Sequence, residues 1–167
     1  MKQTLQYINS LIDEGIILKY AIGGGIASLY YLEPTTTYDL DIMVILAFEE
    51  NIFTPLKPIY EWAKKHDFSV EDEYIFIDSV PVQFLPVYKD LVKEAVENSL
   101  KINLYDVETY VIGPEYLVAI MLDTGRAKDK LRALQFYQEV QLDKDFLNKL
   151  LERYSLKVKL ESLLQQS

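Results

Sequence analysis

Residues 16–42 read IILKYAIGGGIASLYYLEPTTTYDLDI, and this stretch decides the fold. The apolar run 16–22 ends at three consecutive glycines, Gly23 to Gly25, which predicts a strand that enters a tight turn. Residues 26–32 then predict a helix that stops before the next proline, because a residue that precedes proline avoids helical backbone angles. The expected order is therefore strand, glycine turn and helix, and a loop follows at residues 35–37.

The glycine turn is a candidate phosphate site. Glycine lets the backbone approach a ligand closely, and the N-terminus of the following helix offers unpaired N–H groups and the positive end of its dipole. The alternative is a simple turn without a ligand. The GxGxxG spacing of dinucleotide-binding proteins is absent, because Ala27 and Ser28 occupy the later positions.

Residues 38–46 predict a strongly apolar strand that only Asp39 and Asp41 interrupt. Residues two apart in a strand point to the same face, so both carboxylates are expected on one face, and Leu40 and Ile42 on the other. Two neighbouring carboxylates on a largely buried strand repel each other, and a hard divalent cation removes this repulsion. The alternative is an exposed strand end that binds no metal.

The remaining chain predicts a mixed α/β region followed by helices. Helices are expected at residues 5–12, from about 55 to 65 and at 89–98, and two strands, at residues 68–77 and 80–87, are expected to meet at a tight turn at Asp78-Ser79. After Gly113-Pro114 the periodicity becomes helical throughout. We therefore expect an α/β (α+β) core at residues 1–112, with a mixed sheet flanked by helices, and a C-terminal helical bundle at residues 113–167 packed on it.

Composition narrows the classes of function. The 167-residue chain has no cysteine, which excludes disulfides and thiolate sites, and no apolar run of about 20 residues that would span a bilayer. Its formal net charge of −9 disfavours non-specific binding to nucleic acids. These features predict a cytoplasmic protein with no membrane association, and an acidic protein can still bind a nucleotide with the help of a metal ion and local cations.

Together, Gly24-Gly25-Ile26-Ala27 and Thr37-Tyr38-Asp39-Leu40-Asp41-Ile42 resemble the signature of the polymerase-beta-like nucleotidyltransferase superfamily. The resemblance is greatest to small bacterial proteins of the abortive-infection toxin and minimal nucleotidyltransferase branch. Two later stretches, Gly113 to Ala119 and Gly125 to Asp129, also resemble that branch. The resemblance covers roughly residues 18–140.

This resemblance implies a site and an activity. Gly24 and Gly25 would hold the triphosphate, with Ser28 and Thr37 nearby, while Asp39 and Asp41 would bind Mg²⁺, with Mn²⁺ as a second candidate. The implied reaction transfers a nucleoside monophosphate from a nucleoside triphosphate to a hydroxyl group of an RNA, a protein or a small molecule. Two further residues of the resemblance are candidate phosphate or base contacts, Arg126 and Lys128. The alternative for these two is a pair of solvated helix charges that bind Asp129 or Asp123.

The sequence departs from the superfamily pattern at the third carboxylate. Active members carry an acid on a later strand, and here Gln83 of Val80-Pro81-Val82-Gln83 takes that position. An amide offers a carbonyl oxygen but neither a charge nor a base. Two cations expected by the pattern are also absent, because Thr35 and Met121 stand at their positions. A catalytically impaired member is therefore the alternative: a nucleotide-binding or toxin–antitoxin-type module that pairs with an antitoxin-like protein or with a second copy.

Overall fold

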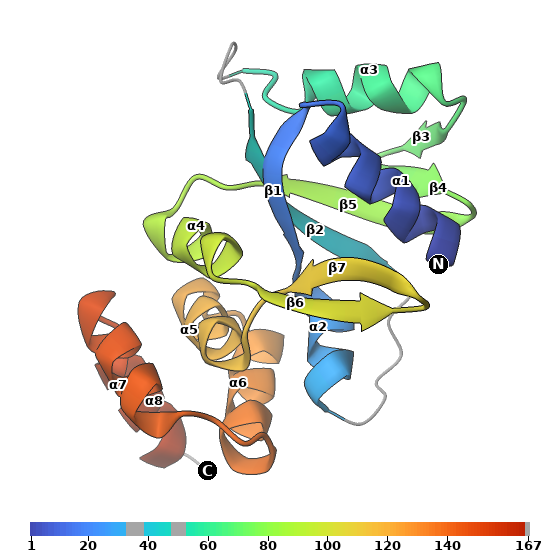
Figure 1. Cartoon of the computed structure of the whole chain (residues 1–167). Helices are drawn as coiled ribbons and strands as arrows, with labels where there is room; N and C mark the ends of the chain where they lie inside the picture. Colours follow the sequence, from blue (N-terminus) through green and yellow to red (C-terminus); the bar gives the residue numbers. More distant parts are fainter. Residues whose placement is uncertain (33–38, 48–52, 166–167) are drawn as a thin grey trace.

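The computed structural model of the chain describes residues 1–32, 39–47 and 53–165. These residues form a mixed α/β fold in which helices flank a seven-stranded sheet (Figure 1). The strand order is β3-β4-β5-β2-β1-β7-β6. The strands are β1 (Ile17–Ile22), β2 (Leu40–Leu46), β3 (Ser69–Glu71), β4 (Tyr74–Ile77), β5 (Val80–Pro86), β6 (Leu100–Leu104) and β7 (Val107–Val111). The predicted fold class, a mixed sheet flanked by helices, is confirmed.

The helices lie on both faces of this sheet and beyond its lower edge in the view of Figure 1. They are α1 (Lys2–Asp13), α2 (Gly24–Tyr31), α3 (Lys57–Lys65), α4 (Asp90–Glu97), α5 (Pro114–Thr124), α6 (Ala127–Glu139), α7 (Lys144–Arg153) and α8 (Lys157–Gln165). Two adjacent residues of β1 show which helices cover which face of the sheet. Tyr20 bonds Asn9 of α1 and Thr109 of β7, whereas Lys19 donates to the carbonyl of Glu97 at the end of α4. Adjacent strand residues point to opposite faces, so α1 and α4 cover opposite faces.

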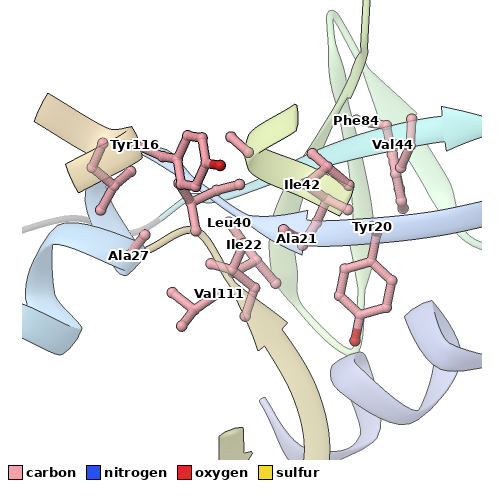
Figure 2. Packing of buried hydrophobic residues seen from close by; sticks show 14 of the residues in the cluster. Tyr20, Ala21, Ile22, Ala27, Leu40, Ile42, Val44, Phe84, Val111 and Tyr116 are labelled. Carbon is pink, nitrogen blue, oxygen red and sulfur yellow. The ribbon is translucent and has the colours of Figure 1, made fainter. Parts of the chain in front are cut away.

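The central strands bury their apolar side chains by alternation. In β2, Leu40, Ile42 and Val44 are fully buried, while Asp41 and Met43 on the other side are only partly covered. Figure 2 shows this apolar row together with buried side chains of the two neighbouring strands, β1 and β5, and of β7 beyond β1. The expectation that Leu40 and Ile42 point away from Asp41 into the core is therefore confirmed.

The segment expected to form one strand at residues 68–77 is a hairpin instead. It divides into β3 and β4 at Asp72, whose φ of 53° turns the chain. Aspartate tolerates the left-handed region, and three consecutive acidic residues, 71–73, repel one another less in an exposed turn than side by side in a strand. The next turn, at Asp78-Ser79, lies where it was predicted, with positive φ at both residues, as a tight hairpin requires.

The last third of the chain is helical, as expected after Gly113. Helix α5 packs against both α6 and α7, α8 contacts α6 and α7, and α4 contacts both α5 and strands β1 and β2. Residues 157–165 form a separate helix, α8, because Ser155 takes a φ of 58° and ends the preceding helical run. Within the described parts of the chain, no helix has the length and apolar character needed to cross a membrane.

Candidate functional site

The glycine turn and Asp41 lie in direct contact. Strand β1 ends at Ile22, the N–H of Gly23 donates to the backbone carbonyl of Asp41 at 2.9 Å, and α2 begins at Gly24. Gly24 has a φ of +54°, and a Cβ placed on it would lie 1.6 Å from Oδ2 of Asp41. Only glycine fits here, because any side chain would occupy the position of the carboxylate. The structure therefore brings together Gly24 and Asp41, which are 17 positions apart in the sequence.

The carboxylate of Asp41 faces the N-terminus of α2. It accepts a hydrogen bond from the backbone N–H of Gly25. Burial raises the pKa of Asp41, and the nearby Asp39 carboxylate raises it further, whereas the Gly25 hydrogen bond and the positive charges of Lys128 and Arg126 act in the opposite direction. The net pKa is raised, so this site holds negative charge at a cost that the protein alone does not offset.

Asp39 and Asp41 are the described residues that suit a metal ion. Asp39 directly precedes β2, and its charge acts on Asp41 through space. Two carboxylates in a partly buried place, one of them with an upward-shifted pKa, are a donor set that fits a hard divalent cation such as Mg²⁺. Among residues 1–32, 39–47 and 53–165, no cluster of three or more acidic, histidine or cysteine side chains forms around this pair.

The strand register places Gln83 beside Asp41. Strands β2 and β5 are parallel, and Asp41 is the partner of Gln83. On the other side of β5, Gln83 pairs with Tyr74 of β4, and Tyr74 pairs with Glu71 at the edge of the sheet. Paired residues point to the same face, so the polar row runs from Asp41 through Gln83 to Tyr74. The amide thus occupies the position that the sequence pattern gives to a third acid, and Glu71 lies two strands farther out.

Arg126 and Lys128 lie at the start of α6 and act on Asp41 through their charges. Arg126 occupies the N-cap position of this helix and forms an ion pair with the buried Asp129 at 2.6 Å. The side chain of Arg126 is nevertheless 61% exposed. Asp123, the other acid considered for this pairing, binds Lys89 at 2.6 Å. The helical region therefore brings two positive charges toward the aspartates, and one of them already has a carboxylate partner.

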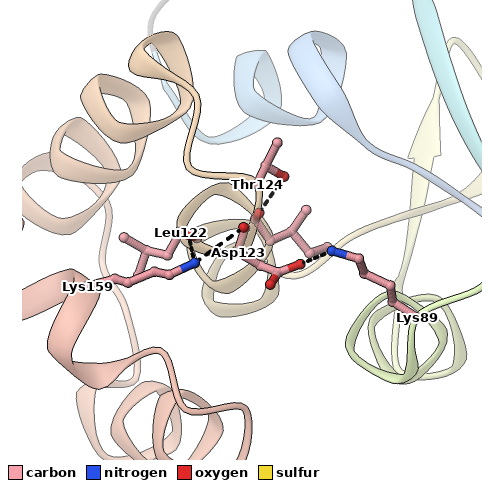
Figure 3. Close-up of polar contacts among 6 residues, drawn as sticks. Lys89, Leu122, Asp123, Thr124 and Lys159 are labelled. Carbon is pink, nitrogen blue, oxygen red and sulfur yellow. Dashed lines mark hydrogen bonds and ion pairs between the residues drawn. The ribbon is translucent and has the colours of Figure 1, made fainter.

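A second set of contacts holds the helix turn that precedes Arg126. Lys159 of α8 donates to the backbone carbonyls of Leu122 and Asp123 at 3.2 and 3.4 Å, as Figure 3 shows. These carbonyls belong to the last turn of α5, which Gly125 ends at a φ of +69°. Lysine binds the unpaired carbonyls of a helix C-terminus well. We infer that α8 and Lys89 together fix the α5–α6 junction and, with it, the approach of α6 to Asp41.

Ser28 and Thr37 are two further residues that the sequence analysis placed near the nucleotide. The hydroxyl of Ser28 is buried and donates to the carbonyl of Gly24 at 2.8 Å, which suits the alternative of close packing within α2. Thr37 lies outside the described residues, as does Thr35. Met121, at the position of an expected cation, is buried in α5.

Tyr74 is a site residue that the sequence analysis missed. Its phenol is close enough to Asp39 and Asp41 for their charges to raise its pKa, although burial is the larger cause. The alternation in Tyr74–Ile77 could have indicated a separate strand, but no sequence signal gives its pairing with Gln83. Strand pairing depends on long-range contacts, so only the folded chain reveals this neighbour.

Comparison with known proteins supports the fold. No protein-family model and no curated protein matches the chain. Among solved structures, it is similar to an antigenic nucleotidyltransferase-like protein from Paracoccidioides brasiliensis, with 16% identity and a TM-score of 0.52 over 98% of this chain and 93% of the other. It is also similar to the antibiotic-resistance factor ANT(2'')-Ia, with 15% identity and a TM-score of 0.54 over 99% and 98% of the two chains. The chain therefore has a nucleotidyltransferase-like fold.

Proposed function

We propose that this protein binds a nucleoside triphosphate with Mg²⁺ and transfers the nucleoside monophosphate to a hydroxyl acceptor. The observation that carries the proposal is the contact between Gly24 and Asp41, where the carboxylate fills the place of a side chain. A structural turn has no need for a charged group in that position. A turn that brings a phosphate next to a metal-binding carboxylate does need a charged group there.

Each part of the site has a role in this proposal. The N-terminus of α2 receives the triphosphate through backbone N–H groups at Gly24 and Gly25, where the helix dipole favours negative charge. Asp39 and Asp41 hold Mg²⁺, which when bound neutralises phosphate charge and polarises the phosphorus centre. Arg126 and Lys128 bring positive charge to the same place from α6. Positioning and charge neutralisation then account for most of the rate.

The second candidate is a catalytically impaired member of the same fold, and Gln83 favours it. Gln83 is the strand partner of Asp41, and its amide cannot accept the proton of an attacking hydroxyl. Such a protein would bind a nucleotide and act as a sensor, or as an interaction module with an antitoxin-like protein or a second copy of the chain. The two candidates share nucleotide binding and differ in transfer.

Calorimetry with each of the four nucleoside triphosphates and Mg²⁺ tests nucleotide binding. We expect binding by the wild-type protein and a loss of about 100-fold in affinity for Asp41→Asn, because the metal loses a charged ligand. Asp106→Asn is the matched control, since Asp106 is 90% exposed in the β6–β7 turn. If no nucleotide binds, or if Asp41→Asn binds as well as the control, both candidates are wrong.

Restoring the third carboxylate separates the two candidates. The variant Gln83→Asp returns an acid to the position beside Asp41, and we expect it to raise the transfer of labelled nucleotide at least tenfold. A general base contributes typically about 10²-fold or more to such a step. Measurable transfer by the wild-type protein supports the active enzyme. Binding without transfer, followed by a gain in Gln83→Asp, supports the impaired one.

A further inference from the structure

The functional groups lie in a linear order across the sheet. The glycine turn follows β1, the aspartates lie at the start of β2, Gln83 lies on β5, and Tyr74 lies on β4. These four strands are consecutive neighbours in the sheet. A triphosphate held at the glycine turn therefore occupies the β1 side of the aspartates. The acceptor hydroxyl has to approach from the opposite side, along β5 and β4.

In the row of paired residues that starts at Asp41, Tyr74 is the first described residue that carries a hydroxyl group. Adjacent strands lie about 4.8 Å apart, so the Cα of Tyr74 is about 10 Å from that of Asp41, and a tyrosine side chain can extend over much of this gap. The side chain is half-buried on the same face as Gln83. The charges of Asp39 and Asp41 act on it directly. Within the described chain, no protein group hydrogen-bonds its hydroxyl.

Five other tyrosines in the described parts of the chain differ from Tyr74 in their positions or their contacts, and Tyr38, which precedes Asp39, lies outside the described residues. The hydroxyls of Tyr20, Tyr31 and Tyr116 are engaged by protein partners. Tyr88 and Tyr105 are exposed, but they lie after β5 and in the β6–β7 turn, and neither belongs to the row of paired residues that includes Asp41. Tyr74 therefore differs from them in combining a hydroxyl without a protein partner with a place beside the aspartates.

We propose that Tyr74 is an acceptor of the transferred nucleotide, so that the protein nucleotidylates itself on this residue. The inference rests on the function proposed above. The phenolic oxygen forms a bond to the α-phosphorus of a nucleoside triphosphate, and the bond from that phosphorus to the oxygen that bridges to the β-phosphate breaks. Pyrophosphate leaves with the electron pair, and the phenolic proton passes to solvent water. The product is a phosphodiester between Tyr74 and the nucleoside.

The consequence of this modification is a blocked site. A nucleotide attached to Tyr74 would lie over Gln83 and next to Asp39 and Asp41, where an external acceptor has to bind. Self-modification would therefore reduce transfer to any other hydroxyl. The attached nucleoside monophosphate also adds negative charge beside two aspartates, which disfavours binding of a second triphosphate.

The experiment incubates the full-length protein with each nucleoside triphosphate labelled at the α-phosphate, with Mg²⁺ or Mn²⁺. It uses wild-type protein and Gln83→Asp in parallel, because the missing carboxylate can slow transfer below detection in the wild type. We expect label on the protein in at least one of them, an intact mass raised by one nucleoside monophosphate, and the added mass on the peptide that contains Tyr74. Peptide mapping gives this answer without any variant of Tyr74.

Two variants sharpen the result. Tyr74→Phe keeps the ring and removes the hydroxyl, so we expect at least a 20-fold loss of label. Tyr88→Phe, the matched control, removes an exposed hydroxyl and is expected to label like its parent. Thermal unfolding checks that Tyr74→Phe remains folded. Label on a different peptide, or equal label in Tyr74→Phe, overturns the inference.

Calorimetry in the same buffer separates this inference from the proposed function. If the protein binds a nucleoside triphosphate and no label appears on wild-type protein or on Gln83→Asp, Tyr74 is not an acceptor, while nucleotide binding stands. If no nucleoside triphosphate binds, the proposed function itself is wrong. If label appears on an added hydroxyl compound but never on the protein, the transfer activity stands and self-modification is excluded.

Discussion

Two partly buried carboxylates in this molecule have opposite surroundings. Asp41, at the glycine turn, has a second carboxylate for a neighbour, and its pKa is raised by burial and by Asp39. Glu94, on α4, accepts hydrogen bonds from Tyr116 of α5, from Arg153 at the end of α7 and from the adjoining Tyr154. Burial raises the pKa of Glu94, but these donors outweigh burial and the net pKa is lowered.

The difference separates a carboxylate that stabilises the fold from one that does not. Glu94 links three helices, and its charge is compensated within the protein, which is how buried charges stabilise a structure. The charge of Asp41 is only partly compensated by the protein, which destabilises the folded chain in the absence of a cation. Functional sites commonly keep such unfavourable groups, because the ligand supplies the missing compensation.

The largest loss of stability is expected from Gly24→Ala, which disrupts the close contact between Gly24 and the Asp41 carboxylate. The new Cβ overlaps Oδ2 of Asp41 and also has to adopt a φ of +54°. We expect a loss of about 2–4 kcal/mol in the free energy of unfolding, from the backbone cost and from overpacking, together with loss of nucleotide binding.

The control for this variant is Gly15→Ala. Gly15 has a similar φ of +69°, but its new Cβ meets nothing within 4 Å. It therefore reports the backbone cost alone, about 1–2 kcal/mol. Urea unfolding of both variants measures the difference. Equal losses in the two variants would show that Asp41 moves away at no cost, and that its contact with Gly24 contributes nothing to stability.

The next effect is expected from Glu94→Gln. The substitution keeps the size of the side chain and removes the charge that three donors bind. We expect the free energy of unfolding to fall by about 1.5–3 kcal/mol, because hydrogen bonds to a charged group contribute this much. Nucleotide affinity should stay within about twofold of wild type, since Glu94 is absent from the row at the aspartates. If Glu94→Gln left the free energy of unfolding unchanged, Glu94 would not be a stabilising carboxylate and would not differ from Asp41 in this respect.

Asp41→Asn is expected to stabilise the protein, whereas Glu94→Gln destabilises it. The amide oxygen can still accept the Gly25 hydrogen bond, while the repulsion from Asp39 and the desolvation of a charge disappear. We expect the metal-free variant to melt about 2–4 °C higher than the wild type, which corresponds to roughly 1 kcal/mol in a chain of this size. Adding Mg²⁺ and nucleotide should raise the melting temperature of the wild type only. Destabilisation by Asp41→Asn would contradict this reading.

The smallest effect concerns the pH dependence of stability. Glu94 has a lowered pKa, so its contribution is present above its unfolded pKa of about 4.3 and is lost as the pH falls through the folded value. Asp41 has a raised pKa, so its unfavourable contribution appears as the pH rises from about 3.9, the unfolded value, through the folded value. Denaturant unfolding between about pH 3.5 and 7 measures both. The deficit of Glu94→Gln and the advantage of Asp41→Asn should both increase with pH, and a flat profile for either would refute its assignment.

Local signals carried much of the prediction. The order strand, glycine turn, helix and strand follows from residues 16–46, because glycine, proline and apolar periodicity act over a few residues. The hairpin at Asp72 was missed, since three acidic residues inside an apolar segment are a weak turn signal. The Glu94 cluster was also missed, because its donors lie 22 to 60 positions away.

The sequence by itself determined the order of a strand, a glycine turn, a helix and a second strand that carries two aspartates. It also determined that Gln83 would stand where an acid was expected. Only the tertiary structure decided that Gly24 contacts Asp41, that Gln83 is its strand partner, and that Tyr74 is next in the row. The physical reason is that turns and faces depend on neighbouring residues, whereas register depends on which apolar faces the whole chain buries together. The chemistry of the site depends on that register.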